Sequence, residues 1–575
     1  MRDEMIARPE PEQLAEARNR DDVIVPSSLA GLVTATLPMV ALAACGGGDG
    51  AISAAPPTPT PPPPVVIVPP TQTQASRFLS QTSMGATKVE IDKVVSQGYD
   101  AWITAQFATP RATSHWDWLV AAGYNVAANQ NNQNGFTNTV WRQVISGEDQ
   151  LRQRVTSALS NFIVVGIDGI MGTSYQQFAA AAYLDVLADN AFGNFRELIE
   201  RVSLNLAMGY YLTFINNKKA NATTGAQPDE NYARELMQLF TLGLYKLNAD
   251  GTLQLSGGNP VETYEPADVS GLARVFTGFV ADGNDFTTPD RARRPMIQKA
   301  TDHELGTKTF LGVTIPAGTD GFASLKIALD TIFAHQNLPP FVSKQLIQRL
   351  ITSNPSPAYV GRVSTIFANN GSGVRGDMKA VIRAILLDTE ARSEASLTST
   401  SAGKLREPVI RLTNWARAFG VTSPSNAWAI GDTNSQTTRL GQTIGKSPSV
   451  FNFFRPGYTP PNTVISTGQL VAPEFQVTNE LSVVGYINYM QTLIQSGTGD
   501  VKADYTSILT KATDSAALIS EINLVLASGN LSTTTIATIK TAVDAIGTTT
   551  PALLANRVYT AILLTMASTD YIVQK

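Results

Sequence analysis

Apolar residues recur at helical spacing along most of the chain from Arg77 onward. In residues 150–165, four apolar side chains share one helical face: Leu151, Val155, Leu159 and Phe162. Three further segments repeat this pattern: residues 341–352, 378–387 and 552–566. Alternating stretches are few, and the best candidate for a strand or a short hairpin is residues 309–315. The sequence therefore predicts a mainly α fold, a multi-helix globular domain with at most minor β hairpins and long ordered loops.

The first 45 residues have the features of an export signal. Residues 29–44 form an uncharged apolar run, shorter than the roughly 20 residues that a membrane-spanning helix needs. The run ends in small residues at Leu42-Ala43-Ala44-Cys45, as the core of a signal peptide does. These four residues also resemble the bacterial lipobox, in which the cysteine becomes the lipidated first residue of the mature protein. The alternative is a chance cysteine after a plain signal peptide.

The segment that follows has the composition of a tether. Residues 46–50 (GGGDG) favour flexibility, and residues 56–70 (PPTPTPPPPVVIVPP) favour an extended polyproline II helix. Such a segment cannot bury enough apolar surface to fold by itself. We therefore predict three regions: a lipoprotein-type signal peptide (1–45), a disordered Gly/Pro-rich tether (46–75) and a helical body (76–575).

These features predict a location as well as an organisation. A lipid on Cys45 would hold the exported chain at a membrane of the cell envelope, on its periplasmic or outer surface. Cys45 is the only cysteine, so it excludes an internal disulfide and a cysteine-rich metal site. The 43 basic and 47 acidic residues are nearly balanced, which gives no electrostatic footprint for nucleic acid.

Several segments carry a resemblance to a known family. The most specific is residues 230–243 (ENYARELMQLFTLG), and further matching segments are residues 77–87, 264–279, 303–312, 447–461 and 472–476. In these segments the chain resembles the DUF1800 family over about residues 76–575. The resemblance implies a bacterial, largely helical and frequently exported protein, whose gene often neighbours one for a DUF1501 protein. It implies no activity, substrate or cofactor.

Residues 230–243 carry the best candidate for a polar cluster. If they form a helix, Asn231, Arg234 and Glu235 share one face at i, i+3 and i+4 spacing. Asp268 and Arg274 are expected on the next helix, where they could meet that face in a helical hairpin. Such a face could bind a ligand, or it could be a buried brace in which Arg234 holds helix ends together.

Two further candidates for chemistry lie in residues 303–308. His303, beside Glu304 in a glycine-containing loop, could act as a general acid or base, because imidazole titrates near neutrality. The catalytic candidates are therefore Glu235, His303 and Lys308. The alternative for His303 is a structural role, in which its ring is hydrogen-bonded within the fold. We assign no metal site, although His303 with Glu304 or Glu235 is a weaker possibility for one.

The aromatic segment 447–458 (SPSVFNFFRPGY) contains enough prolines to predict a long ordered loop. We take three of its residues as ligand-binding candidates: Phe453, Arg455 and Tyr458. Aromatic rings with a few polar groups bind ring-shaped ligands, but the same residues could equally fill a core.

Two functions follow from these observations. The first is a binding or assembly protein of the envelope that works with a partner such as a DUF1501 protein. The alternative is an envelope hydrolase or transferase acting on a polymer, with a site around Glu235, Arg234, Asp268 and His303. The chain has no nucleophile elbow, phosphate-binding loop, HExxH, CxxC or dinucleotide fingerprint that would name a reaction or a cofactor.

Overall fold

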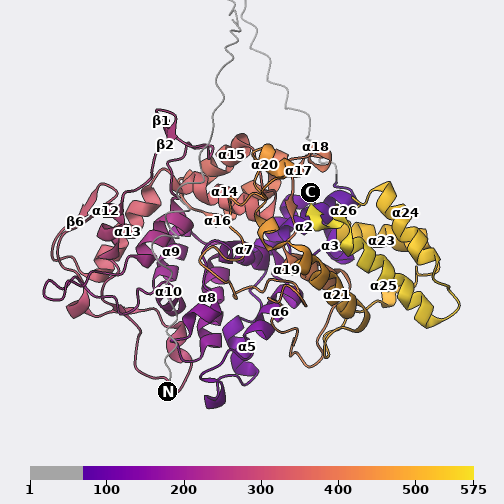
Figure 1. Cartoon of the computed structure of the whole chain (residues 1–575), viewed down its shortest axis with the longest axis horizontal. Helices are drawn as coiled ribbons and strands as arrows, with labels where there is room; N and C mark the ends of the chain where they lie inside the picture. Colours follow the sequence, from indigo (N-terminus) through magenta and orange to yellow (C-terminus); the bar gives the residue numbers. More distant parts are fainter. Residues whose placement is uncertain (1–68) are drawn as a thin grey trace, which may run out of the picture. The chain divides into compact units, whose positions relative to one another are not determined.

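The described structure, a computed structural model, covers residues 69–575 and begins with a capped helix (Figure 1). The Thr71 hydroxyl accepts from the backbone N–H of Gln74, and the Gln74 side chain accepts from the Thr71 N–H. This capping box starts helix α2 (Gln72–Thr82) within the segment 46–75 predicted as a tether. The helical body therefore begins earlier than residue 76. The predicted signal peptide, Cys45 and residues 46–68 lie outside the described residues.

Helix α8 (Gln176–Asn190) is the central helix of the first half of the body. It is buried on almost every side, and its alanines at 179–182 let neighbouring helices pack closely. Its neighbours in Figure 1 are α5 (His115–Ala121), α6 (Phe136–Ser146), α7 (Gln150–Ser160), α9 (Phe195–Ser203) and α10 (Leu206–Tyr211). Two more helices pack beside α2: α3 (Lys88–Gln97) and α4 (Tyr99–Ala108).

The middle of the chain combines helices with short antiparallel hairpins. Its helices are α11 (Asn231–Glu235), α12 (Pro266–Ala273), α13 (Gly321–Ala334) and α14 (Leu338–Leu350). Three strand pairs join them: β1 (Leu255–Ser256) with β2 (Asn259–Pro260), β3 (Phe279–Val280) with β4 (Ile297–Gln298), and β5 (Lys308–Phe310) with β6 (Val313–Ile315). The predicted hairpin at 309–315 is confirmed, with Thr309 opposite Thr314.

The last third of the chain returns to helices. These are α15 (Pro357–Ala368), α16 (Met378–Leu387), α17 (Thr389–Arg392), α18 (Ala395–Thr398), α19 (Pro408–Ala418), α20 (Val464–Thr467), α21 (Glu480–Ser496), α22 (Thr506–Leu509), α23 (Ser515–Ala527), α24 (Thr533–Asp544), α25 (Pro551–Ala567) and α26 (Thr569–Ile572). Strand β7 (Lys404–Leu405) pairs with β8 (Val573–Gln574), so the last residues of the chain lie beside the segment that precedes α19.

The mainly α prediction is confirmed, with one difference at residues 230–243. The α-helical geometry ends at Glu235, and residues Leu236–Thr241 form a π-helix. The backbone N–H groups of Leu242 and Gly243 both donate to the Met237 carbonyl, and Gly243 has a φ of 79°, which a glycine adopts without strain. Within residues 69–575, no helix combines the length and apolar character needed to cross a membrane.

Candidate functional site

Arg234 lies at the surface, where it is 46% exposed and pairs at 2.9 Å with Glu230, the N-cap residue of its own helix α11. The Ser270 hydroxyl of α12 donates to the other oxygen of Glu230, and this hydrogen bond links α11 to α12. Asn231 lies beside Arg234 and donates to the Thr213 hydroxyl at 3.4 Å. Helices α11 and α12 do pack against each other as expected, but Arg234 is exposed and is not the buried brace that the sequence offered as one alternative.

Asp268 caps a helix and orients a hairpin. One carboxylate oxygen accepts from the backbone N–H of Glu265 at 2.8 Å, and the other accepts from that of Leu311 at 2.7 Å. Asp268 lines an open pocket of about 710 Å³, but each of its oxygens already has a backbone partner. Arg274 follows the last residue of α12 and is exposed. These contacts hold α12 against the β5–β6 hairpin.

His303 is fully buried and hydrogen-bonded to the backbone. Its Nδ1 lies 2.8 Å from the Thr277 carbonyl oxygen, and burial lowers its pKa, which favours the uncharged ring. No hydrogen bond within residues 69–575 joins His303 to Glu235, because the side-chain bonds of His303 go to Thr277.

Lys308 is buried beside the same loop. Its Nζ lies 3.4 Å from the Gly306 carbonyl oxygen, and burial lowers its pKa, an effect that the Glu304 carboxylate opposes. Among residues 69–575, no group of three or more histidine, cysteine, aspartate and glutamate side chains is placed to hold a metal ion. His303 and Lys308 are therefore buried side chains on either side of an exposed loop at residues 305–307, and Lys308 begins strand β5.

Glu235 combines an unpartnered buried oxygen with a pKa near neutrality, whereas Nε2 of His303 is also unpartnered but burial lowers the pKa of that ring. The side chain of Glu235 is nearly buried, and its Oε2 has no hydrogen-bond partner. Burial raises its pKa to about 7, and the Arg234 charge only partly offsets this. Its charge also contributes to raising the pKa of Tyr211 and Tyr264, after the larger effect of burial. It is the last residue before the π-helix, and such turns are frequent at functional sites.

Several side chains of the loop 447–458 pack against the protein instead of lying free at its surface. Phe454 is buried, and the guanidinium of Arg455 stacks on the Phe451 ring at 4.8 Å. Asn452 donates to the side-chain oxygen of Asn161 at 2.6 Å. Phe453 and Tyr458 are half-buried, and Tyr458 contributes its carbonyl to the Ala472 N–H. The loop is irregular, as its prolines predicted.

A buried ionic network fastens this part of the chain, and no local sequence pattern revealed it. Nζ of Lys404 lies 2.8 Å from Oε1 of Glu474 and 3.9 Å from Oε1 of Glu407, and these side chains are at most 2% exposed. The same ammonium group donates to the Arg349 carbonyl at 2.8 Å, close to the C-terminal end of α14. A cation suits that end of the helix dipole.

Amide side chains complete the network. Asn161 and Gln442 both donate to the carboxylate of Glu407, at 3.1 and 2.8 Å from the same oxygen. Asn452 in turn donates to Asn161, so residue 452 belongs to this interior cluster. The network joins α7, α14, β7 and the segments around residues 442, 452 and 474. It therefore holds long irregular loops against the helical body.

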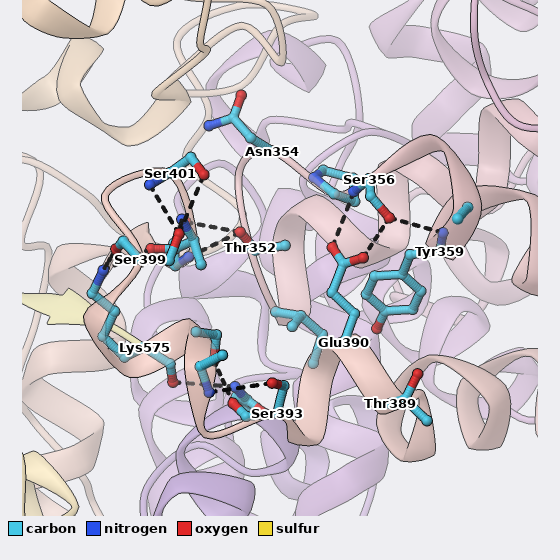
Figure 2. Close-up of a pocket in the computed structure, with 18 of the residues that line it drawn as sticks. Thr352, Asn354, Ser356, Tyr359, Thr389, Glu390, Ser393, Ser399, Ser401 and Lys575 are labelled. Atoms are coloured by element: carbon cyan, nitrogen blue, oxygen red, sulfur yellow. Dashed lines mark hydrogen bonds between the residues drawn. The ribbon is translucent and has the colours of Figure 1, made fainter. Parts of the chain in front are cut away.

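A second large cleft lies away from these candidates and was not predicted from the sequence. It encloses about 770 Å³ between α2, the start of α15, helices α17 and α18, and loop 399–403 (Figure 2). Its lining, within the described part of the chain, includes none of the candidates named from the sequence. Hydroxyl groups are frequent in it: Thr352, Ser356, Thr389, Ser393, Ser399 and Ser401. Serine and threonine are common in loops of every kind, which is why no sequence pattern pointed to this cleft.

Comparison with known proteins places this fold in a family. The model of the DUF1800 family, described as a protein of unknown function, matches residues 77–573. The chain belongs to the DUF1800 family. No curated protein and no solved structure matches it. The DUF1800 match begins in α2 and ends in β8, so it includes Glu235, the buried network and the cleft lining apart from Lys575. The resemblance expected from the motifs is confirmed.

Proposed function

We propose that this DUF1800 protein is an exported, lipid-anchored protein of the cell envelope that binds a ligand in the cleft of Figure 2. We further propose that it works with a partner, such as a DUF1501 protein. The apolar run ending at Cys45 and the Gly/Pro-rich segment after it support export and tethering. The cleft supports the proposal that the folded part of the chain binds a ligand.

The observation that carries the binding proposal is the way in which the cleft is built. Its walls come from segments around residues 77, 355, 390, 400 and 470. Hydrogen bonds fix these walls to one another: Asn354 exchanges two bonds with the backbone of Val471, each 2.9 Å long. A volume of about 770 Å³ lies within the range of small-ligand sites, and a fixed wall loses little entropy when a ligand binds.

The anchor is tested by labelling cells with a radioactive fatty acid. We expect the full-length protein to carry the label and to sediment with membranes. The variant Cys45→Ser should lose both properties, while the control Ser53→Ala, a nearby substitution in the tether, should keep both. Label that persists in Cys45→Ser would refute lipidation at this residue. Purification of the anchored protein, with and without a co-expressed DUF1501 neighbour, tests the partner.

A second function has one observation in its favour. The pKa of about 7 and the unpartnered oxygen of Glu235 suit a group that exchanges a proton at neutral pH, as an envelope hydrolase or transferase requires. Its test is the release of soluble fragments from purified cell-wall polymer by the intact protein. Glu235→Gln should abolish that release, whereas the exposed control Glu480→Gln should not. Release that is equal in both variants would remove Glu235 from the reaction.

A further inference from the structure

The cations that line the cleft already have protein partners. Nε of Arg77 donates to the Lys575 backbone oxygen at 3.1 Å. Arg362 makes two bonds of 2.8 Å with the carboxylate of Asp388. Nζ of Lys575 donates to two backbone oxygens of loop 399–402, at 2.6 and 2.9 Å. An anionic ligand would have to displace one of these contacts, and a charged group is costly to leave without its partner.

The groups that remain for a ligand are uncharged donors and a single acceptor carboxylate. The Thr389 hydroxyl makes no hydrogen bond to the described chain, and the amide of Asn354 has a second N–H beyond the one given to Val471. Glu390 accepts from the backbone N–H of Ser356 at 3.0 Å and from its hydroxyl, which fixes the carboxylate and leaves it further accepting capacity. Donors and an acceptor therefore line the same cleft, and Figure 2 labels Asn354, Thr389 and Glu390 among its residues.

Apolar surface lies between these polar groups. Its residues are Ile351, Pro355, Ala358 and Leu470. A wall that alternates apolar patches with hydroxyl and amide groups suits a ligand with C–H faces and a ring of hydroxyl groups. Each hydroxyl of such a ligand can both donate and accept, as the lining requires.

We propose that the cleft binds a neutral saccharide, an inference that rests on the binding function proposed above. An extended peptide fits less well, because peptides of that kind add to a free strand edge. Strand β7 pairs with β8 along one edge, and the Gly403 carbonyl just before it, which an added strand would need, already accepts from the Ser353 N–H and the Thr352 hydroxyl. The bonded cations disfavour an anionic sugar.

The test is titration calorimetry of the full chain with pentasaccharides. The neutral probes are cellopentaose, maltopentaose, xylopentaose and chitopentaose; pentagalacturonate is the anionic probe and pentaglycine the peptide. Ala358→Trp fills the cleft from an exposed helical position, and Ala537→Trp in α24 is its matched control. Thr389→Val removes one hydroxyl at constant shape, and Thr534→Val, also exposed and in α24, is its control.

We expect at least one neutral probe to bind saturably. Ala358→Trp should abolish that binding, and Thr389→Val should weaken it about threefold to tenfold, as the loss of one hydrogen bond does. Both controls should bind as the parent does. If only pentagalacturonate or pentaglycine binds, and Ala358→Trp abolishes it, the saccharide inference is overturned while the binding function stands. If no probe binds, or if binding is insensitive to Ala358→Trp, the cleft loses both assignments.

Discussion

Replacing Lys404 by methionine should destabilise the fold strongly, because it leaves carboxylates in the interior without their cation. The ammonium group contacts Glu474 at 2.8 Å and Glu407 at 3.9 Å, and all three side chains are at most 2% exposed. Methionine has a similar length, so packing changes little. Removing one partner of a buried ion pair costs about 3–5 kcal/mol, because the other charge stays buried and unpaired.

The cost of Lys404→Met should grow with pH. Burial raises the pKa of Glu474 in the folded protein, and Lys404 is the main group that opposes this rise. Without Lys404 the folded-state pKa rises further above the unfolded value of about 4.3. A carboxyl with a raised folded pKa holds its proton more tightly in the folded state, so stability is lost as pH rises above about 4.3. We expect a smaller cost at pH 5 than at pH 8.

Urea unfolding followed by tryptophan fluorescence measures this effect at both pH values. Lys511→Met is the matched control, because the Lys511–Glu521 pair has a similar distance of 2.7 Å but is 40% and 22% exposed. Its loss should cost about 0–1 kcal/mol. The double variant Lys404→Met with Glu474→Leu should recover most of the loss, because it removes both charges. Equal costs for Lys404→Met and Lys511→Met would refute the reasoning.

Three further variants test other parts of the structure. Glu235→Gln should raise the free energy of unfolding by about 3 kcal/mol at pH 8 and leave it nearly unchanged at pH 4. The reason is that the carboxyl has a folded-state pKa of about 7, so it lowers the stability of the parent protein as pH rises above the unfolded value of about 4.3. Urea unfolding at the two pH values checks this. His115→Gln should make the protein more resistant to acid. Burial lowers the folded-state pKa of His115 to about 3, so the stability of the parent protein falls as pH drops below the unfolded value of about 6.5. We expect the variant to gain about 3 kcal/mol at pH 4, measured by acid-induced unfolding. Gly271→Ala should cost more than about 3 kcal/mol or prevent folding, since its new methyl group would lie 1.8 Å from the Thr309 carbonyl oxygen. The control Gly457→Ala meets nothing within 4 Å and should leave thermal unfolding nearly unchanged.

Helices were predictable where the apolar period was regular. Residues 378–387 coincide with α16, and residues 341–352 and 552–566 fall largely within α14 and α25. The helix expected over residues 150–165 ends at Ser160, and the side chain of its C-cap residue Asn161 donates to Glu407 in the network. That partner is 246 residues away, and a local period carries no information about such a contact.

The candidate sites were harder to predict, because a polar residue looks the same in a motif whether it caps a helix or binds a ligand. The motif predicts Asp268 as a ligand-binding residue, and in the fold its oxygens accept at the start of α12 and at the β5–β6 turn. His303 is a candidate because imidazole titrates near neutrality, and in the fold burial lowers its pKa. The sequence places Glu235 on a helix, but only the fold shows that one of its oxygens has no partner.

The buried network and the cleft are coupled through the chain, which gives a last prediction. Gly403 lines the cleft one residue before Lys404, and Leu470 lines it four residues before Glu474. The Lys404–Glu474 pair therefore fastens two walls of the cleft to each other at 2.8 Å. If the walls separate when the pair is broken, a ligand must reorder them on binding, and that ordering reduces affinity. Lys404→Met should then weaken binding of any ligand that Ala358→Trp excludes, under conditions where the variant is still folded, while Lys511→Met should not. Unchanged affinity in folded Lys404→Met would mean that the network stabilises the body without shaping the cleft.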